Sequence, residues 1–203
     1  MQIIGGRYKG RKLFAPPGRK TRPTSGKVRE AVFNICASLV PDARVADLFA
    51  GTGAMGIEAL SRGAKHAVFV EADREAAGLI KRNLAACGAE DRSAVLCLDL
   101  LRGPQALAGM DSAFDLVFMD PPYNSQALAP SLEVLVKSGA LARGAVVVIE
   151  HQPAEPVPEG IAELEVFDCR RYGKTLVSFM SHVVAGRESE EETSGKQEGK
   201  PDR

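Results

Sequence analysis

Tryptophan is absent from this sequence, and aromatic residues make up only 5% of its 203 positions. Long apolar runs are absent too, since none reaches the roughly 18 residues needed to cross a bilayer. The N-terminus also lacks the apolar stretch of a signal peptide. We therefore expect a soluble, cytoplasmic protein. Its 45% of hydrophobic residues suffices for one buried α/β core with small attachments.

Cysteines are few and widely separated. The four are Cys36, Cys87, Cys97 and Cys169, and no two of them form a C-x-x-C pair. Disulfide frameworks and zinc sites usually have closely spaced cysteines. We therefore expect reduced structural thiols and no metal site.

Acidic residues are missing from residues 1–29, although the whole chain has a formal net charge of zero. The basic residues of this segment are Arg7, Lys9, Arg11, Lys12, Arg19, Lys20, Arg22, Lys27 and Arg29. A cationic end on an otherwise acidic chain favours contact with a polyanion. The alternative is a solvated, disordered leader. Apolar residues interleaved with the charges disfavour it, since a purely solvated tail has little use for them. They are Ile3, Ile4, Tyr8, Leu13 and Phe14.

Composition and periodicity divide the chain into three parts. Residues 1–40 are expected to form a basic N-terminal arm and a helix, which Ser25 caps and which ends near Leu39. Residues 41–186 alternate between short apolar runs and helical patterns, as an α/β domain does. Residues 187–203 are rich in Glu, Ser, Gly and Lys, which predicts a disordered tail.

The patterns within the domain predict a doubly wound, Rossmann-like α/β fold. The predicted strands cover residues 44–49, 66–71, 94–98, 114–119 and 145–150. The predicted helices cover residues 54–62, 73–86 and 126–138. The central strands are almost continuously apolar, which is typical of a mostly parallel sheet with helices on both faces. Residues 162–168 and 174–181 alternate more, and they are predicted to form a closing antiparallel hairpin.

A glycine-rich turn follows the first predicted strand. The segment Asp47-Leu-Phe-Ala-Gly-Thr-Gly-Ala-Met-Gly56 fits the G-x-G-x-x-G fingerprint, and Glu71 ends the second strand 20 residues after Gly51. The glycines let the backbone approach a ligand, and the Glu71 carboxylate can accept both hydroxyl protons of a ribose. The pattern therefore predicts a nucleoside-containing ligand. The candidate cofactor-binding residues here are Asp47, Phe49, Gly51, Thr52, Gly53, Gly56 and Glu71.

Asp47 helps to choose between ligands of this class. A carboxylate beside the helix N-terminus opposes a pyrophosphate, but it suits the cationic groups of S-adenosylmethionine. The alternative is that Asp47 only caps the helix or the turn, and Glu71 could equally be a surface charge. Asp99 and Leu100 follow the third strand, where they can reach an adenine ring, although Asp99 could also be a simple capping residue.

The catalytic signal is the segment Asp120-Pro121-Pro122-Tyr123, directly after the fourth predicted strand. Two consecutive prolines fix the backbone and remove two amide donors, so the turn presents hydrogen-bond acceptors and an aromatic ring. The exocyclic amine of a base is a poor nucleophile because its lone pair is delocalised. Hydrogen bonds to the Asp120 carboxylate and the Pro121 carbonyl would localise that lone pair and stabilise developing positive charge.

The same segment predicts how a base is held. Tyr123 can stack on the base and align its amine with the methyl group of S-adenosylmethionine. A base inside a duplex would first have to leave the stack. The alternative is a rigid loop in which Tyr123 is simply packed. No cysteine lies in this turn, which disfavours carbon methylation through a covalent adduct. We therefore predict methyl transfer to a base amine in nucleic acid.

The ordered motifs resemble those of class I amino-methyltransferases, and the N-terminal third resembles the RsmD family more particularly. The segments that carry this resemblance are residues 3–13, Arg22-Pro23-Thr24 and residues 28–34, within a likeness that extends from about residue 2 to residue 181. The resemblance implies a seven-stranded sheet and S-adenosylmethionine-dependent methylation of a guanine N2 amine in small-subunit (16S) ribosomal RNA. It further implies an assembled small-subunit particle as the substrate.

The resemblance also places Arg22 and Thr24 near the catalytic cleft, where Thr24 would contact the cofactor and Arg22 a phosphate or the cofactor carboxylate. Tyr123 departs from relatives that carry Phe, so its hydroxyl is expected to be dispensable. We expect a monomer. The predicted contacts to RNA are Arg7, Lys9, Arg11, Lys12 and Arg22.

Three alternatives stay open at this point. The same chemistry could act on adenine in DNA, on another RNA or on a protein glutamine, although the basic arm disfavours a protein substrate. The chain could be a non-catalytic RNA-binding or ribosome-assembly protein that keeps the fold, which the intact Asp120–Tyr123 segment disfavours. A dinucleotide oxidoreductase is the third, and Asp47 disfavours it.

Overall fold

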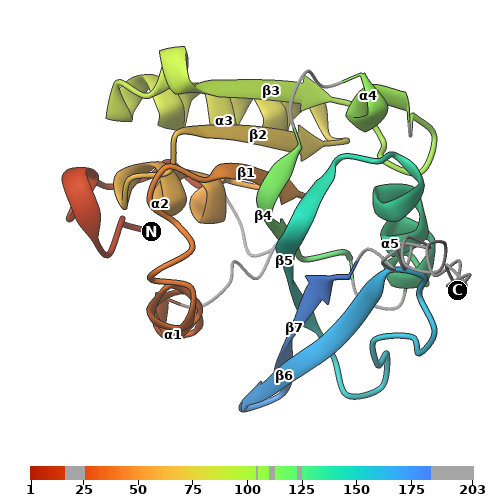
Figure 1. The fold of residues 1–203 in the computed structure, drawn as a ribbon. Helices are drawn as coiled ribbons and strands as arrows, with labels where there is room; N and C mark the ends of the chain where they lie inside the picture. Colours follow the sequence, from red (N-terminus) through yellow and green to blue (C-terminus); the bar gives the residue numbers. More distant parts are fainter. Residues whose placement is uncertain (17–25, 104, 110–112, 123–124, 184–203) are drawn as a thin grey trace, which may run out of the picture.

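A seven-stranded sheet with helices on both faces forms the centre of the protein (Figure 1). The computed structural model describes residues 1–16, 26–103, 105–109, 113–122 and 125–183. The strand order is β3-β2-β1-β4-β5-β7-β6. The strands are β1 (Arg44–Leu48), β2 (His66–Glu71), β3 (Ser93–Cys97), β4 (Phe114–Met119), β5 (Leu141–His151), β6 (Leu164–Tyr172) and β7 (Thr175–His182).

Strands β3, β2, β1, β4 and β5 pair in parallel, and β7 runs antiparallel to both β5 and β6. The predicted doubly wound sheet and its closing hairpin are therefore confirmed. Because the strand order reverses between β1 and β4, a crevice is expected beyond the carboxyl ends of these two strands. That edge is where the chain turns after Leu48 and after Met119.

The helices divide between the two faces of the sheet. Helices α1 (Gly26–Ile35), α2 (Ala54–Ser61) and α3 (Arg74–Cys87) contribute to one buried apolar cluster, and α4 (Gln105–Ala108) and α5 (Leu128–Lys137) to the other. The longest of the described helices, α3, has 14 residues, which is shorter than a bilayer-spanning helix.

Three predicted boundaries differ from the structure by four residues, among them the end of β6, which lies at Tyr172 rather than at residue 168. Helix α1 ends at Ile35 rather than near Leu39, because the chain turns after Cys36 and buries Val40 instead of Leu39. Strand β5 begins at Leu141, four residues before its prediction, since Leu141 pairs with Phe114 ahead of a register shift. The predicted cap Ser25 lies outside the described residues.

Residues 1–16 form part of the same core as the α/β domain. Ile3, Tyr8 and Leu13 are each buried to 5% exposure or less, in the cluster that α1, α2 and α3 share. A bridge between Gln2 and Lys12 closes a small loop around the 3-10 turn η1 (Gly6–Tyr8). For these residues the disordered-leader alternative is wrong, because three of the five interleaved apolar side chains are core residues, whereas Phe14 is exposed.

The carboxylate of Glu58, fully buried on α2, anchors this N-terminal segment. It accepts hydrogen bonds of 2.8 Å from the amides of Ile4 and Gly5, and it pairs with Arg62 at 2.8 Å and with Arg29 at 3.6 Å. The charged carboxylate therefore satisfies two backbone donors and Arg62, and it supplies a countercharge to the buried guanidinium of Arg29.

Candidate active site

The turn between β1 and α2 has the backbone conformation that its glycines predict. Phe49, Gly51 and Gly53 have φ angles of 62°, 55° and 74°, and Gly53 precedes the first turn of α2. A Cβ atom on Gly56 would lie 2.3 Å from the Phe69 ring, so the absent side chain lets α2 pack directly on β2. The turn brings backbone close to the carboxyl ends of β1 and β2.

Asp47 lies under this turn, and its carboxylate is buried. Its Oδ2 atom accepts a hydrogen bond of 2.8 Å from the Gly56 amide in the first turn of α2. Burial, and less strongly the charge of Glu71, raise the pKa of Asp47 from 3.8 to about 7. The chain's own carboxylate thus occupies the position at the helix N-terminus where a dinucleotide phosphate would bind.

Glu71 is fixed at the end of β2 by two backbone amides. Its Oε2 atom accepts from Gly51 at 2.7 Å and its Oε1 atom from Asp73 at 2.8 Å. An ionised carboxylate has about four acceptor positions. Both oxygens can therefore still accept a ribose hydroxyl, and they are held against the glycine turn that the ribose would reach.

Asp99 and Leu100 follow β3 at the same edge of the sheet. The Asp99 carboxylate accepts from the Leu101 amide at 3.0 Å and lies 3.4 Å from Arg102, while Leu100 is buried. Both contacts are local to this turn, as expected from the alternative in which Asp99 is a capping residue. In the glycine turn, the carbonyl of Thr52 accepts a hydrogen bond of 2.9 Å from the Asn83 side chain, which fixes the position of Thr52.

Asp120 follows β4 and lines a pocket with an empty volume of about 310 Å³, part of which is open to solvent. Asp47, Glu150, Met55 and Val177 line the same pocket. Burial, then Glu150 and Asp47, raise the pKa of Asp120 from 3.8 to about 8. Three carboxyl groups thus share a single pocket, which favours a ligand with hydrogen-bond donors or positive charge.

The proline turn is described only in part. Pro121 is buried and Pro122 is exposed, and the Pro122 carbonyl accepts a hydrogen bond from the Ser125 hydroxyl. Tyr123 lies outside the described residues, as do Arg22 and Thr24.

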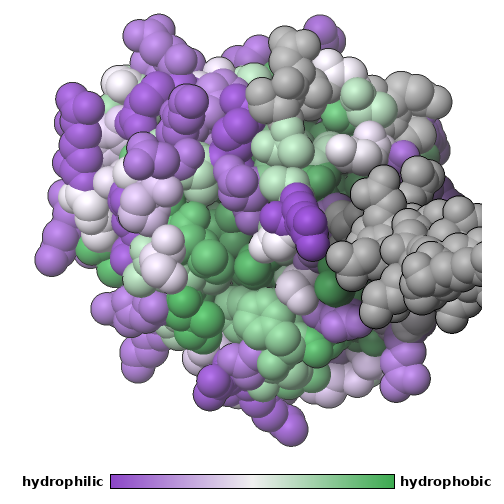
Figure 2. Space-filling model, in the orientation of Figure 1, coloured by the Kyte–Doolittle hydropathy of each residue, from purple (hydrophilic) through white to green (hydrophobic). Residues whose placement is uncertain are grey.

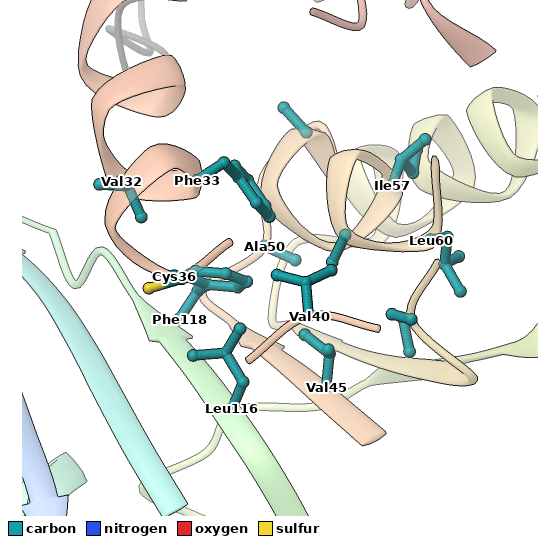
Figure 3. Close-up of a cluster of buried hydrophobic side chains, with 14 of the residues drawn as sticks. Val32, Phe33, Cys36, Val40, Val45, Ala50, Ile57, Leu60, Leu116 and Phe118 are labelled. Carbon is teal, nitrogen blue, oxygen red and sulfur yellow. The ribbon is translucent and has the colours of Figure 1, made fainter. Parts of the chain in front are cut away.

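Helix α1 forms the wall of the pocket opposite the sheet. Val32 lines the pocket, and the rings of Phe33 and Phe118 pack at a centroid distance of 5.3 Å (Figure 3). On the face drawn in Figure 2, apolar residues gather between α1 and the β6–β7 hairpin, with hydrophilic residues around them. An apolar surface beside three carboxyl groups suits a flat, polar-edged ring such as a base.

Sequence reasoning missed the pocket residues that come from outside the known motifs. Glu150 is the clearest of them, because it ends an apolar strand at the carboxyl edge, as Asp120 follows one. This position at the carboxyl end of an apolar strand is the sequence signal that could have identified Glu150. Val32 and Val177 had no such signal, since each looks like an ordinary core residue in its own element, and Met55 lies within the glycine motif but was not singled out.

Four basic residues of the N-terminal segment lie on the surface, whereas Arg29 is buried. Arg7, Lys9, Arg11 and Lys12 are all exposed, around the loop that packs beside α1 and α2 (Figure 1). The Arg11 guanidinium also donates to the Ala86 carbonyl of α3.

Comparison with known proteins decides the family. A family model described as "Conserved hypothetical protein 95" matches residues 1–181. The Escherichia coli K12 protein named Ribosomal RNA small subunit methyltransferase D is 36% identical over 158 residues, 78% of each chain. The chain belongs to the RsmD family. The protein YlbH of Bacillus subtilis is 37% identical over 178 residues, 88% of this chain and 97% of YlbH.

Solved structures of other proteins also match this chain. That of yhhF from Escherichia coli matches with a TM-score of 0.80 at 33% identity, over 90% of this chain and 98% of that one. The fold is therefore that of a class I, Rossmann-like methyltransferase, and the seven-stranded sheet implied by the sequence resemblance is confirmed. RsmD membership accounts for the basic N-terminal segment and the Asp120 turn together, since the family match spans both.

Proposed function

We propose that the protein transfers a methyl group from S-adenosylmethionine to the N2 amine of a guanine in small-subunit ribosomal RNA. The observation that carries the proposal is the pocket in which Asp120 and Asp47 lie together, beside the glycine turn and Glu71. Relatives named as small-subunit ribosomal RNA methyltransferases, at 33% and 36% identity, support the reaction class and the RNA substrate.

The residues around the glycine turn fit S-adenosylmethionine, which supplies an electrophilic methyl group on a sulfonium. Glu71 holds two acceptor oxygens toward the turn, where they bind the ribose hydroxyls. Asp47 keeps a carboxyl group at the start of α2, which disfavours phosphate and favours an ammonium. Thr24, Phe49, Asp99 and Leu100 complete the proposed cofactor site.

Asp120 is the proposed catalytic residue. Its carboxylate and the Pro121 carbonyl accept hydrogen bonds from the target amine, which localises the nitrogen lone pair and stabilises positive charge as it develops. Pro122 fixes the turn, and Tyr123 stacks on the base. The acceptor role requires an ionised Asp120, and the cationic donor beside it lowers the pKa that burial has raised.

The basic N-terminal residues are proposed to bind the RNA backbone, as part of a docking region formed by residues 1–40. Arg7, Lys9, Arg11 and Lys12 are exposed on a segment that is anchored to the domain. A positively charged surface of fixed position can orient a polyanion relative to the pocket. An assembled small-subunit particle is the proposed substrate.

The test uses small ribosomal subunits from a strain that lacks this gene. Incubation with the purified protein and S-adenosylmethionine should add one methyl group to one guanine, located by mass mapping of the ribosomal RNA. Asp120→Ala should abolish transfer while binding of S-adenosylmethionine stays measurable by calorimetry. Glu71→Ala should instead weaken that binding. A methylated adenine, or turnover by Asp120→Ala, would overturn the assignment.

A further inference from the structure

Glu150 stands beside Asp120 at the mouth of the crevice. Met119 of β4 pairs with Ile149 of β5, and Asp120 and Glu150 come directly after this pair. Neighbouring strands lie about 4.8 Å apart, so the two backbones are adjacent at this point. On its other side Glu150 pairs with Val177 of β7. Glu150 is thus held on a strand that pairs with β7, rather than on a loop.

Along each of these strands, successive side chains point to opposite faces of the sheet. Phe118 on β4, Asp120 directly after it, and Val148 and Glu150 on β5 line the pocket together with Met119 and Val177. Residues two apart in a strand share a face, which accounts for Phe118 with Asp120 and for Val148 with Glu150. Glu150 also interacts electrostatically with Asp120. Two carboxyl groups from neighbouring positions of the sheet edge therefore face the same pocket.

Guanine, adenine and cytosine each carry an exocyclic amine, but they differ in a ring nitrogen next to that amine. Guanine has a ring N1–H donor next to its N2 amine, whereas adenine and cytosine each have a ring nitrogen that only accepts. When both groups are ionised, as the acceptor role of Asp120 requires, a pair of adjacent carboxylates offers acceptors only. Such a pair is satisfied by the two neighbouring donors of guanine, and it opposes the lone pair of adenine or cytosine.

Resting on the proposed function, we propose that Glu150 selects guanine by accepting a hydrogen bond from the base N1–H while Asp120 accepts from the N2 amine. Glu150 is then a specificity-determining residue that contacts the substrate, and it does not act on the transferred methyl group. A site built to bind an N–H group rejects analogues that lack it, because its own acceptor is left unsatisfied.

The test compares guanine with 2-aminopurine, which keeps the 2-amine but has an acceptor at N1. Small subunits are reconstituted with either base at the methylated nucleotide, and single-turnover methyl transfer is measured. The wild-type protein should prefer guanine by about 10- to 100-fold, the range expected for one hydrogen bond to a charged group. Glu150→Gln can turn its amide to donate to N1, so the preference should shrink by at least about tenfold.

The matched control is Glu165→Gln, an exposed carboxylate on β6, which should leave the preference unchanged. A structural role for Glu150 would lower both rates by the same factor and keep their ratio, which would overturn the inference. Equal rates on the two bases with the wild-type protein would overturn it without any variant. If guanine is still methylated in either of these outcomes, the proposed function stands. If guanine is not methylated at all, both the proposed function and the proposed role of Glu150 are wrong.

Discussion

At the scale of single residues, the site depends on the lack of a side chain at Gly56 as well as on the side chains of its other residues. Gly56 has no Cβ, so the Phe69 ring can lie where that atom would be. Asp47 then reaches the Gly56 amide, because α2 sits close to the end of β1. One small residue thereby sets both the packing of α2 and the position of a buried carboxylate.

Gly56→Ala should lower the free energy of unfolding by about 2 kcal/mol, since overpacking of a close contact costs about 1–3 kcal/mol. The control is Gly78→Ala, which is exposed on α3 with no atom within 4 Å of its Cβ position. That change should raise the free energy of unfolding by about 0.5–1 kcal/mol through helix propensity. Urea unfolding measures both, and equal effects would contradict the packing argument.

The raised pKa of Asp120 predicts how the free energy of unfolding depends on pH. In the folded chain its pKa is raised from 3.8 to about 8. Between these values the folded chain keeps a proton that the unfolded chain has lost, so the contribution of Asp120 to stability falls as pH rises through this range. Asp120→Asn does not titrate, so its stability relative to the wild type should rise with pH, by at most about 1.4 kcal/mol per pH unit, between about pH 4 and about pH 8.

Urea unfolding of both proteins across that range tests this difference. Asp99→Asn serves as the control, because its side chain is 42% exposed on a turn. A gap between Asp120→Asn and wild type that stays constant with pH would show that burial does not shift the Asp120 pKa.

At the scale of elements, α2 and α3 connect the N-terminal segment to the cofactor turn. Glu58 on α2 holds the Ile4 and Gly5 amides. Asn83 on α3 accepts from the Phe14 amide at 2.7 Å, and its side-chain amide donates to the Thr52 carbonyl at 2.9 Å. The proposed RNA-binding segment and the glycine turn are therefore fixed to the same two helices.

Glu58→Gln should lower the free energy of unfolding by about 3–5 kcal/mol, because it leaves Arg29 and Arg62 without their buried countercharge. The matched control is Glu133→Gln on α5, whose exposed pair with Lys137 should be worth less than about 1 kcal/mol. Denaturant unfolding of the two variants gives the comparison. Similar losses in both would show that the buried pair is not what anchors the segment.

At the scale of the whole molecule, charge is distributed unevenly over a neutral chain. Four basic residues of the N-terminal segment lie exposed around one loop, whereas the pocket gathers three carboxyl groups. A polyanion is attracted to the first surface and repelled by the second. We infer that backbone binding and base binding are separated in space, so that only an unstacked base enters the acidic pocket.

Replacing Arg7, Lys9, Arg11 and Lys12 by Gln should weaken binding to small ribosomal subunits and reduce its dependence on salt. Each lost phosphate contact should lower the slope of log affinity against log salt by about 0.7–0.9. The control replaces four exposed basic residues elsewhere, namely Arg102, Lys137, Arg143 and Lys174. Equal slopes for the two variants would mean that the N-terminal segment is not the docking surface.

The sequence by itself determined the parallel sheet, the glycine turn, and the carboxylates at the carboxyl ends of β1, β2 and β4, because these depend on local periodicity and on motifs of fixed spacing. It also carried the family resemblance. Tertiary structure alone decided the helix boundary at Ile35, since the burial of Val40 overrides helical periodicity. It likewise placed Glu150 and Val177 beside Asp120, because contacts between strands distant in the chain depend on sheet order, which no local pattern encodes.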